Sequence, residues 1–264
     1  MNEFDRRTFI KQALALGTGL AGLSSPAQAG PKHELSADRM GVLVDTTACI
    51  GCRNCEWACK TAHELPTDDV ETYEDKSVFK TPRRPDETAL TDVNRCASLK
   101  TPGVPYGVKV QCMHCDHPAC LSACIVGAIS KAEDGSVVWN SDKCIGCRYC
   151  MIACPFQIPA FEYGKALQGR IMKCDFCHER RLDGGLPACV ERCPVEALTY
   201  GRREDLVRVA KERVKRAPER YIRHIYGEFE VGGTSWLYLA GRDFTDLKFP
   251  KLGDKPAPGV SESI

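Results

Sequence analysis

The sequence has no excess of charge of either sign and no long hydrophobic run. Its 264 residues include 36 Lys or Arg and 35 Asp or Glu, for a net charge of +1. Composition therefore gives no electrostatic reason to expect nucleic acid or an anionic membrane surface as a partner. No run of about 20 apolar residues is present, which argues against a multi-span membrane protein. The hydrophobic fraction of 43% is typical of a folded chain rather than a disordered one.

The sequence also lacks the residue patterns of a catalyst. It contains no nucleophile beside a base, no nucleotide-binding loop and no open metal site, so no residue stands out as able to act on a substrate. What it has in excess is cysteine, with 17 residues. A chain of this length buries enough apolar surface to fold without covalent cross-links. The cysteines therefore indicate metal ligation.

The first 29 residues are predicted to be an export signal rather than part of the fold. The pair Arg6-Arg7 precedes a mild apolar run over residues 12–23, and a small-residue cleavage pattern ends at Ala29. The run is too short to span a membrane, and an uncleaved amphipathic helix would need a polar face that it does not have. The arginine pair resembles a twin-arginine signal, which is read by the route that moves folded proteins. We therefore expect a mature chain that begins at Gly30 and carries its cofactor when it reaches the periplasm.

Sixteen of the cysteines form four groups of four along the chain. Groups one and three have the spacing C-x2-C-x2-C-x3-C, whereas the middle gap is four residues in group two and eleven in group four. The members are Cys49, Cys52, Cys55 and Cys59 in group one, Cys112, Cys115, Cys120 and Cys124 in group two, Cys144, Cys147, Cys150 and Cys154 in group three, and Cys174, Cys177, Cys189 and Cys193 in group four. Cys96 is left over and is expected to be a packed free thiol.

The spacing of groups one and three matches the bacterial ferredoxin pattern for [4Fe-4S] clusters, in which the fourth cysteine ligates the other cluster of a pair. Three thiolates spaced by two residues lie in one tight loop and can bind three irons. The fourth lies one helical turn further on and can face a neighbouring cluster. The alternative is a structural adaptor of an exported complex, held by zinc or disulfides. Structural zinc usually takes cysteine pairs from separate hairpins, and these short spacings suit disulfides poorly, so clusters are favoured.

Apolar segments beside the groups predict how the groups pair. A short strand is expected after group two, over residues 125–129, and another over residues 137–139 leads into group three. Similar strands are expected before group one, over residues 42–45, and after group four, over residues 194–201. Groups two and three therefore form one two-cluster unit, and groups one and four form a second unit wrapped around it. Consecutive pairing, of one with two and of three with four, is the alternative.

Exchange of the fourth ligand within each unit predicts four ligand sets. Each set is expected to hold one [4Fe-4S] cluster, with iron bound by its four thiolates. The members are Cys49, Cys52, Cys55 and Cys193 in set 1, Cys59, Cys174, Cys177 and Cys189 in set 2, Cys112, Cys115, Cys120 and Cys154 in set 3, and Cys124, Cys144, Cys147 and Cys150 in set 4.

Several stretches of the chain resemble one protein family. Besides the ordered cysteine groups they are Gln111-Cys-Met-His-Cys, the run from Cys144 to Pro155, the run from Gly185 to Pro194, and Gly232-Gly233-Thr234 with the apolar strand after it. Together they are similar to the four-cluster electron-transfer subunit of membrane-associated respiratory oxidoreductases. That family includes the formate dehydrogenase beta subunit, the iron-sulfur partner of the quinone-linked uptake hydrogenase, and the iron-sulfur subunit of sulfite-reduction membrane complexes.

The resemblance implies an α+β fold of two interleaved bacterial ferredoxin-like units, each with two [4Fe-4S] clusters. These units would occupy residues 30–201, after the signal over 1–29 and before a C-terminal extension over 202–264. The resemblance also implies a non-catalytic periplasmic subunit that relays electrons between a catalytic oxidoreductase subunit and a quinone-reactive membrane subunit or a multihaem cytochrome. Formate dehydrogenase and hydrogenase subunits of this kind end in a membrane helix that the chain lacks, so its membrane association is expected to come from a partner.

Three further expectations concern segments around the ligands. The stretch over residues 60–110 is predicted to be a long insertion that contacts a partner subunit. Residues 202–216 are predicted to form an amphipathic helix, whose apolar face comprises Leu206, Val209, Ala210 and Val214. The histidines expected to be partly exposed neighbours of the ligands, rather than ligands themselves, are His114, His117 and His178.

Overall fold

The structure, a computed structural model, describes residues 35–96, 106–165 and 169–260. The predicted export signal over residues 1–29 lies outside these ranges. Helices and short strands alternate along the described chain, which is the mixed α+β content expected of a ferredoxin-like fold. Within these ranges no helix is both long enough and apolar enough to cross a membrane.

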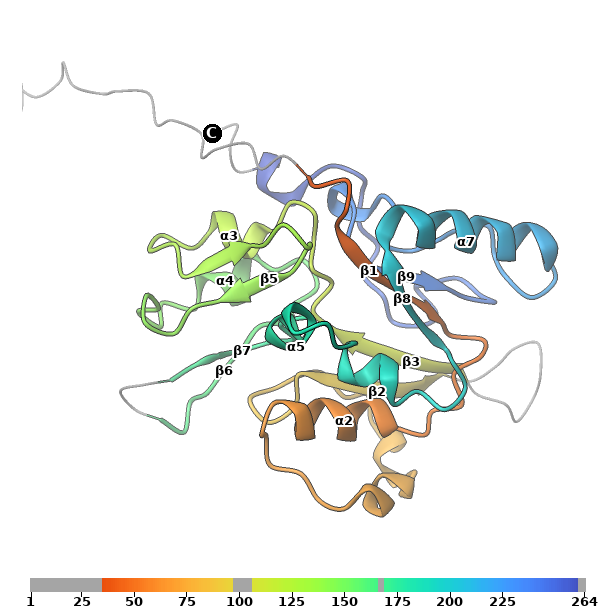
Figure 1. Cartoon of the computed structure of the whole chain (residues 1–264), viewed down its shortest axis with the longest axis horizontal. Helices are drawn as coiled ribbons and strands as arrows, with labels where there is room; N and C mark the ends of the chain where they lie inside the picture. The colour runs from red at the N-terminus through yellow and green to blue at the C-terminus, as the bar shows by residue number, and fades with distance from the viewer. Residues whose placement is uncertain (1–34, 97–105, 166–168, 261–264) are drawn as a thin grey trace, which may run out of the picture. The chain divides into compact units, whose positions relative to one another are not determined.

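A three-stranded sheet joins distant parts of the chain (Figure 1). The central strand β1 (Met40–Asp45) pairs antiparallel with β8 (Leu198–Arg202) and parallel with β9 (Trp236–Leu239). Because β1 precedes group one and β8 follows group four, the strands that flank the two outer cysteine groups are neighbours. All four residues of β9 are buried, and a strand buried on both faces has a continuous apolar sequence rather than an alternating one.

Helix α7 (Arg203–Arg216) packs against β1 and β8, as the predicted amphipathic helix. Leu206 and Ala210, one helical turn apart, are buried against leucines of β1 and β9, and Val214 packs at the edge of this cluster. Val209 was predicted on the same face, but it is 40% exposed. The buried face of the helix is narrower than predicted, because it comprises only Leu206, Ala210 and Val214, which are spaced four residues apart.

The chain between and around groups two and three forms a small antiparallel hairpin with two short helices beside it. These elements are β4 (Ile129–Lys131), β5 (Val137–Trp139), α3 (Ala119–Ser122) and α4 (Tyr149–Ala153). The strand predicted over residues 125–129 begins only at Ile129. The residues before it form a turn in which Gly127 has a φ of 61°, and Ile125 is 71% exposed as a result.

The region over residues 60–110 is folded in the parts that the structure describes. It follows α2 (Asn54–Ala62) and contains the 3-10 turns η1 (Val70–Glu74) and η2 (Ser77–Lys80) and the hairpin of β2 (Thr91–Cys96) with β3 (Tyr106–Gln111). Figure 1 shows α2 beside this hairpin. The buried Glu56 carboxylate of α2 accepts hydrogen bonds from Arg83 Nη2 and from the backbone N–H of Val93, both at 2.6 Å. The region is therefore attached to the helix that carries Cys55 and Cys59.

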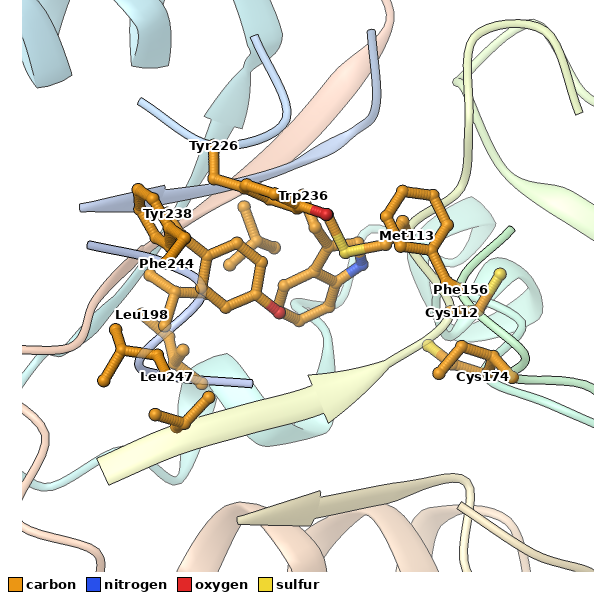
Figure 2. Close-up of a cluster of buried hydrophobic side chains, with 14 of the residues drawn as sticks. Cys112, Met113, Phe156, Cys174, Leu198, Tyr226, Trp236, Tyr238, Phe244 and Leu247 are labelled. Carbon is orange, nitrogen blue, oxygen red and sulfur yellow. The ribbon is translucent and has the colours of Figure 1, made fainter. Parts of the chain in front are cut away.

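A mixed core of aromatic and sulfur-containing side chains lies against the central sheet. Trp236, Tyr238 and Tyr226 belong to it, together with Cys112 and Cys174. In Figure 2 Tyr226, Tyr238 and Phe244 lie at the left of the view, and Phe156 lies at the right with the two cysteines. The remaining elements are β6 (Ala160–Phe161), β7 (Ile171–Met172), α5 (His178–Leu182), α6 (Ala188–Glu191), η3 (Glu230–Gly232) and η4 (Ala257–Val260).

Candidate metal centres

Left-handed backbone positions shape the cysteine loops. In group one, Gly51 and Arg53 have φ values of 66° and 70°, and in group three Gly146 and Arg148 have 68° and 63°. Left-handed residues in such turns let successive N–H groups converge on one point, which forms a concavity suited to an anion. The glycines take this conformation without steric strain. Each loop then leads directly into a helix, α2 or α4.

The thiols of set 1 surround one small cavity. Cys49, Cys52, Cys55 and Cys193 all line it, with apolar side chains of β1 and β8 and with Lys109. Burial raises the pKa of Cys49 to about 11, with smaller contributions from the thiolates of Cys193 and Cys52. The structure thus brings the last cysteine of group four to the first three of group one.

In set 2, Cys59 lies near the first three cysteines of group four. Burial raises the pKa of Cys189 to about 11, and the thiolates of Cys59 and Cys177 act in the same direction. Burial is also the main cause of the raised pKa values of Cys174 and Cys177, to which the charge of Cys59 again contributes. All four members are therefore close enough for their charges to interact.

In set 3, Cys154 lies near the first three cysteines of group two. Burial raises the pKa of Cys115 well above its usual value, and the thiolates of Cys112, Cys154 and Cys120 raise it further. The same combination of burial with Cys112 and Cys154 brings the pKa of Cys120 to about 12. Both thiols thus have Cys112 and Cys154, members of the predicted set, among their neighbours.

In set 4, Cys124 lies near the first three cysteines of group three. Burial raises the pKa of Cys150 to about 11, with contributions from Cys144, Cys147 and Cys124 in that order. The Cys124 sulfur accepts a hydrogen bond from the backbone N–H of Ala128 at 3.2 Å. Of the seventeen cysteines, all of which lie in the described ranges, only Cys147 is exposed.

Consecutive sets are also within range of each other's charge. Thiolates of one set contribute to the raised pKa of a thiol in the next, although burial of that thiol contributes most in each case. The pairs are Cys55 with Cys189 for sets 1 and 2, Cys174 with Cys112 for sets 2 and 3, and Cys120 with Cys150 for sets 3 and 4. These electrostatic interactions indicate that set 1 lies near set 2, set 2 near set 3, and set 3 near set 4.

The described residues fit anionic iron-sulfur clusters. All seventeen cysteines are free thiols. Three buried N–H donors, His114 Nε2, Trp139 Nε1 and Trp236 Nε1, have no hydrogen-bond partner within the described part of the chain. Both tryptophans pack in core clusters that contain cysteines of the sets. Buried N–H donors normally have a hydrogen-bond partner, and the sulfurs of an iron-sulfur cluster accept hydrogen bonds. Four thiols with unpaired N–H donors nearby are therefore the arrangement expected around such a cluster.

Sequence reasoning missed the lysines that lie beside the sets. Lys109 and Lys173 are buried, and Lys131 is half-buried. Lys131 Nζ donates to the carbonyl oxygen of Cys115 at 2.9 Å, and Lys173 Nζ to that of Cys174 at 3.1 Å. Each lysine lies in or next to an apolar strand close to a cysteine group. A lysine in such a segment is unusual, because lysine side chains are mostly exposed. This position in the sequence could have predicted that the three lysines lie beside the cysteine groups.

His114 is fully buried, in contrast to the prediction that it would be partly exposed. Its Nδ1 accepts a hydrogen bond from the backbone N–H of Val137 at 2.8 Å. Its ring stacks on that of Phe176, with 4.9 Å between the two ring centroids. Burial, together with nearby lysine charges, lowers the pKa of His114 well below its usual value, so the ring is neutral. His117 and His178 are half-buried, and His178 Nδ1 lies 3.1 Å from a carboxylate oxygen of Asp134.

His63 also makes polar contacts beside set 2, and the sequence did not indicate them. Its Nε2 lies 2.8 Å from Asp175 Oδ1, and its Nδ1 lies 2.8 Å from the carbonyl oxygen of Cys59. Burial favours the neutral ring, but Asp175 and the Cys59 sulfur outweigh it and raise the pKa of His63 well above its usual value. His63 and Asp175 therefore form an ion pair beside the thiols of set 2.

The fold and the four cysteine groups indicate a ferredoxin-type iron-sulfur protein, and the sequences of known proteins support this class. Residues 106–203, which contain groups two to four, match the 4Fe-4S dicluster domain family. A protein of Nitratidesulfovibrio vulgaris strain Hildenborough is 46% identical over 263 residues, which cover 96% of this chain and 69% of that protein. The hydrogenase-2 operon protein HybA of Escherichia coli O157:H7 is 36% identical over 293 residues, covering 98% of this chain and 88% of HybA. The iron-sulfur subunit of the nitrate-inducible formate dehydrogenase of Escherichia coli strain K12 is 32% identical over 201 residues, covering 75% of this chain and 66% of the subunit.

The chain belongs to the family of ferredoxin-type iron-sulfur subunits of respiratory oxidoreductases. The resemblance inferred from the cysteine groups is thereby confirmed at the level of the family. Membership brings with it [4Fe-4S] clusters as cofactors and electron transport as the general role.

Proposed function

We propose that the chain is a non-catalytic electron-transfer subunit that carries four [4Fe-4S] clusters, one in each of sets 1 to 4. The observation that supports this proposal is that the four cysteines of set 1 line one cavity, and that thiols of each other predicted set are close enough to influence one another's pKa. In this proposal residues 30–201 form two interleaved ferredoxin-like units, and residues 202–264 extend them. The pairing of β1 with β8 and of β4 with β5 supports the interleaving.

The bound clusters would supply one-electron redox chemistry, and the protein would hold and insulate them. Cysteine thiolates bind the irons, while buried N–H groups such as His114 Nε2 and Trp236 Nε1 are available to cluster sulfurs. Apolar core side chains pack against cysteines of all four sets. The spatial order of the sets gives electrons a continuous route through the subunit. Exposed Cys147, beside Ile145 at 62% exposure, supports set 4 as an end of that route that a redox partner can approach.

The proposed setting is the periplasm, reached by the twin-arginine route through the signal over residues 1–29. There the subunit would pass electrons between a catalytic oxidoreductase subunit and a quinone-reactive membrane subunit or a multihaem cytochrome, which also hold it at the membrane. The relatives support a catalytic partner, since their names refer to a hydrogenase operon and to a formate dehydrogenase. The region over residues 60–110 is proposed as a surface for one of these partners.

Iron and acid-labile sulfide analysis of the anaerobically purified chain tests the proposal. We expect about sixteen irons and about sixteen sulfides per chain, because each [4Fe-4S] cluster holds four of each. The brown absorbance should bleach on addition of dithionite. A colourless protein with stoichiometric zinc, or with paired cysteines and no metal, would instead support a structural adaptor and would reject the electron-transfer role.

A further inference from the structure

Lys109 carries a positive charge into the interior without a carboxylate to balance it. The residue lies on β3 and is 2% exposed. Its Nζ donates hydrogen bonds to Thr91 Oγ1 at 2.6 Å and to Gln111 Oε1 at 3.2 Å, which are both neutral groups. Among the described residues no ion pair joins Lys109 to an aspartate or glutamate, whereas Arg83 pairs with both Glu56 and Asp92.

An isolated ammonium in this position would normally lose its proton. Burial favours the neutral amine, and neutral hydrogen-bond acceptors compensate only part of the lost hydration. Burial indeed acts to lower the pKa of Lys109, but the thiolates of Cys189, Cys55 and Cys174 more than reverse this effect and raise it. The groups that favour the charged ammonium are therefore cysteine sulfurs, which are anionic when they bind iron.

Lys109 lies between two ligand sets. Cys55 belongs to set 1, whose cavity Lys109 lines, while Cys189 and Cys174 belong to set 2. The ring of Trp236 lies 4.8 Å from Nζ and limits the space around the ammonium. Set 3 has its own cations, since the charges of Lys131 and Lys173 act on Cys115 and Cys120.

We propose that Lys109 is an electrostatic tuning residue, a single countercharge shared by the clusters of sets 1 and 2 that raises the reduction potential of both. The inference rests on the proposed function. A [4Fe-4S] cluster takes up one electron on reduction and becomes one unit more negative, while Lys109 keeps its proton throughout. A fixed positive charge therefore stabilises the reduced form more than the oxidised form. Because one ammonium serves two neighbouring clusters, their potentials are raised together.

A redox titration of the full-length, cluster-loaded protein tests this role. The variants are Lys109→Met, which removes the charge, Lys109→Gln, which removes the charge but keeps a donor for Thr91 and Gln111, and Lys109→Arg, which keeps the charge. Lys80→Met is the matched control, because Lys80 is exposed on the wall of a neighbouring cavity of about 530 Å³ that Lys109 also lines. Potentials are followed by electron paramagnetic resonance after iron and sulfide have been measured in each sample.

We expect Lys109→Met and Lys109→Gln to shift two of the four cluster components to more negative potentials. Lys109→Arg and Lys80→Met should leave all four close to those of the unmodified protein. If Lys109→Met does not fold, Lys109→Gln alone decides the question. Full cluster content with unmoved potentials in the neutral variant would overturn the role of Lys109, as would an equal shift in Lys109→Arg. An unmodified chain without iron and sulfide would overturn the proposed function itself, so the two failures are distinguishable.

Discussion

Asp92 is a carboxylate held where its charge is unfavourable. It is 4% exposed and lies 2.9 Å from Arg83 Nη1, but it shares that guanidinium with Glu56. Burial and repulsion from Glu56 raise the pKa of Asp92 from 3.8 to about 6, against the opposing effect of Arg83. The folded chain therefore holds the proton of Asp92 more tightly than the unfolded chain does. This group's contribution to stability is complete below pH 3.8 and is lost as the pH rises to about 6.

Replacement of Asp92 by asparagine should therefore change how stability depends on pH. Relative to the unmodified protein, Asp92→Asn should gain about 2 kcal/mol between pH 4.5 and pH 7.5, because asparagine has no charge to bury. The measurement is the apparent melting temperature of the anaerobically handled protein at both pH values. Asp68→Asn, at an exposed position, is the control. A difference in melting temperature that is the same at both pH values would contradict the prediction.

At the scale of elements, the Glu56 side chain of α2 provides the hydrogen bonds that join this helix to Arg83 and Val93 of the region over residues 60–110. Glu56 is buried and receives hydrogen bonds from Arg53, Arg83 and the backbone of Val93. A buried carboxylate with three donors is stable, but the guanidinium groups around it lose their compensation if it is removed. The contact therefore fixes the β2–β3 hairpin relative to the first two ligand sets.

Glu56→Ala should detach this region while the four cysteine groups stay unchanged in sequence. The expected cost is about 3 kcal/mol, typical of removing one partner from a buried charged network. Hydrogen–deuterium exchange should show loss of protection in β2 and η1, since local opening becomes easier. Glu71→Ala, at an exposed position of η1, should leave exchange unchanged. Unaltered protection of β2 in Glu56→Ala would show that other contacts hold the region.

Local signals explain which elements could be predicted from the sequence. The strand over residues 137–139 and the helix over 203–216 match the prediction within one residue, because periodicity and flanking turns act over a few residues. Ile125 and its neighbours are apolar yet lie in an exposed turn, so hydrophobicity alone misplaced that strand. The contact between Glu56 and Arg83 spans 27 residues, and nothing local in the sequence predicts it.

In the candidate site, too, local features could be predicted from the sequence and long-range features could not. Cysteine spacing is local and is enough to predict the sixteen thiols as ligands, whereas the burial of Lys109 and His114 depends on strands brought together from distant segments. Exchange of ligands between groups was predicted from the ferredoxin pattern and the flanking strands. The neighbours of Cys115 and Cys150 lie within the same predicted sets.

For the whole molecule, the pairing of cysteine groups decides how the clusters connect. Nested pairing places Cys59 and Cys189 on one cluster, in set 2, and the thiolate of Cys59 does act on that of Cys189. Consecutive pairing would instead place Cys59 with cysteines of group two. The two arrangements therefore predict different pairs of variants with the same spectroscopic defect.

Cys59→Ser and Cys189→Ser should alter the same component of the electron paramagnetic resonance spectrum of the reduced protein. Serine is a harder and weaker ligand for iron, so that cluster should be lost or converted while the other three persist. Cys112→Ser should alter a different component, and Cys96→Ser should alter none. A defect shared by Cys59→Ser and Cys112→Ser, but not by Cys189→Ser, would favour consecutive pairing.

The pairing of β1 with β8 also bears on the order in which a growing chain is completed. Under the proposed ligand sets, sets 3 and 4 need only residues 112–154, whereas sets 1 and 2 also need the cysteines of group four. Closing so long a loop is entropically costly and slow compared with local contacts. The inner pair of clusters can therefore be inserted early, and the outer pair only after β8 has been synthesised and has reached β1. Under the proposed ligand sets, a chain with all its iron must therefore have been synthesised at least through Cys193 and β8.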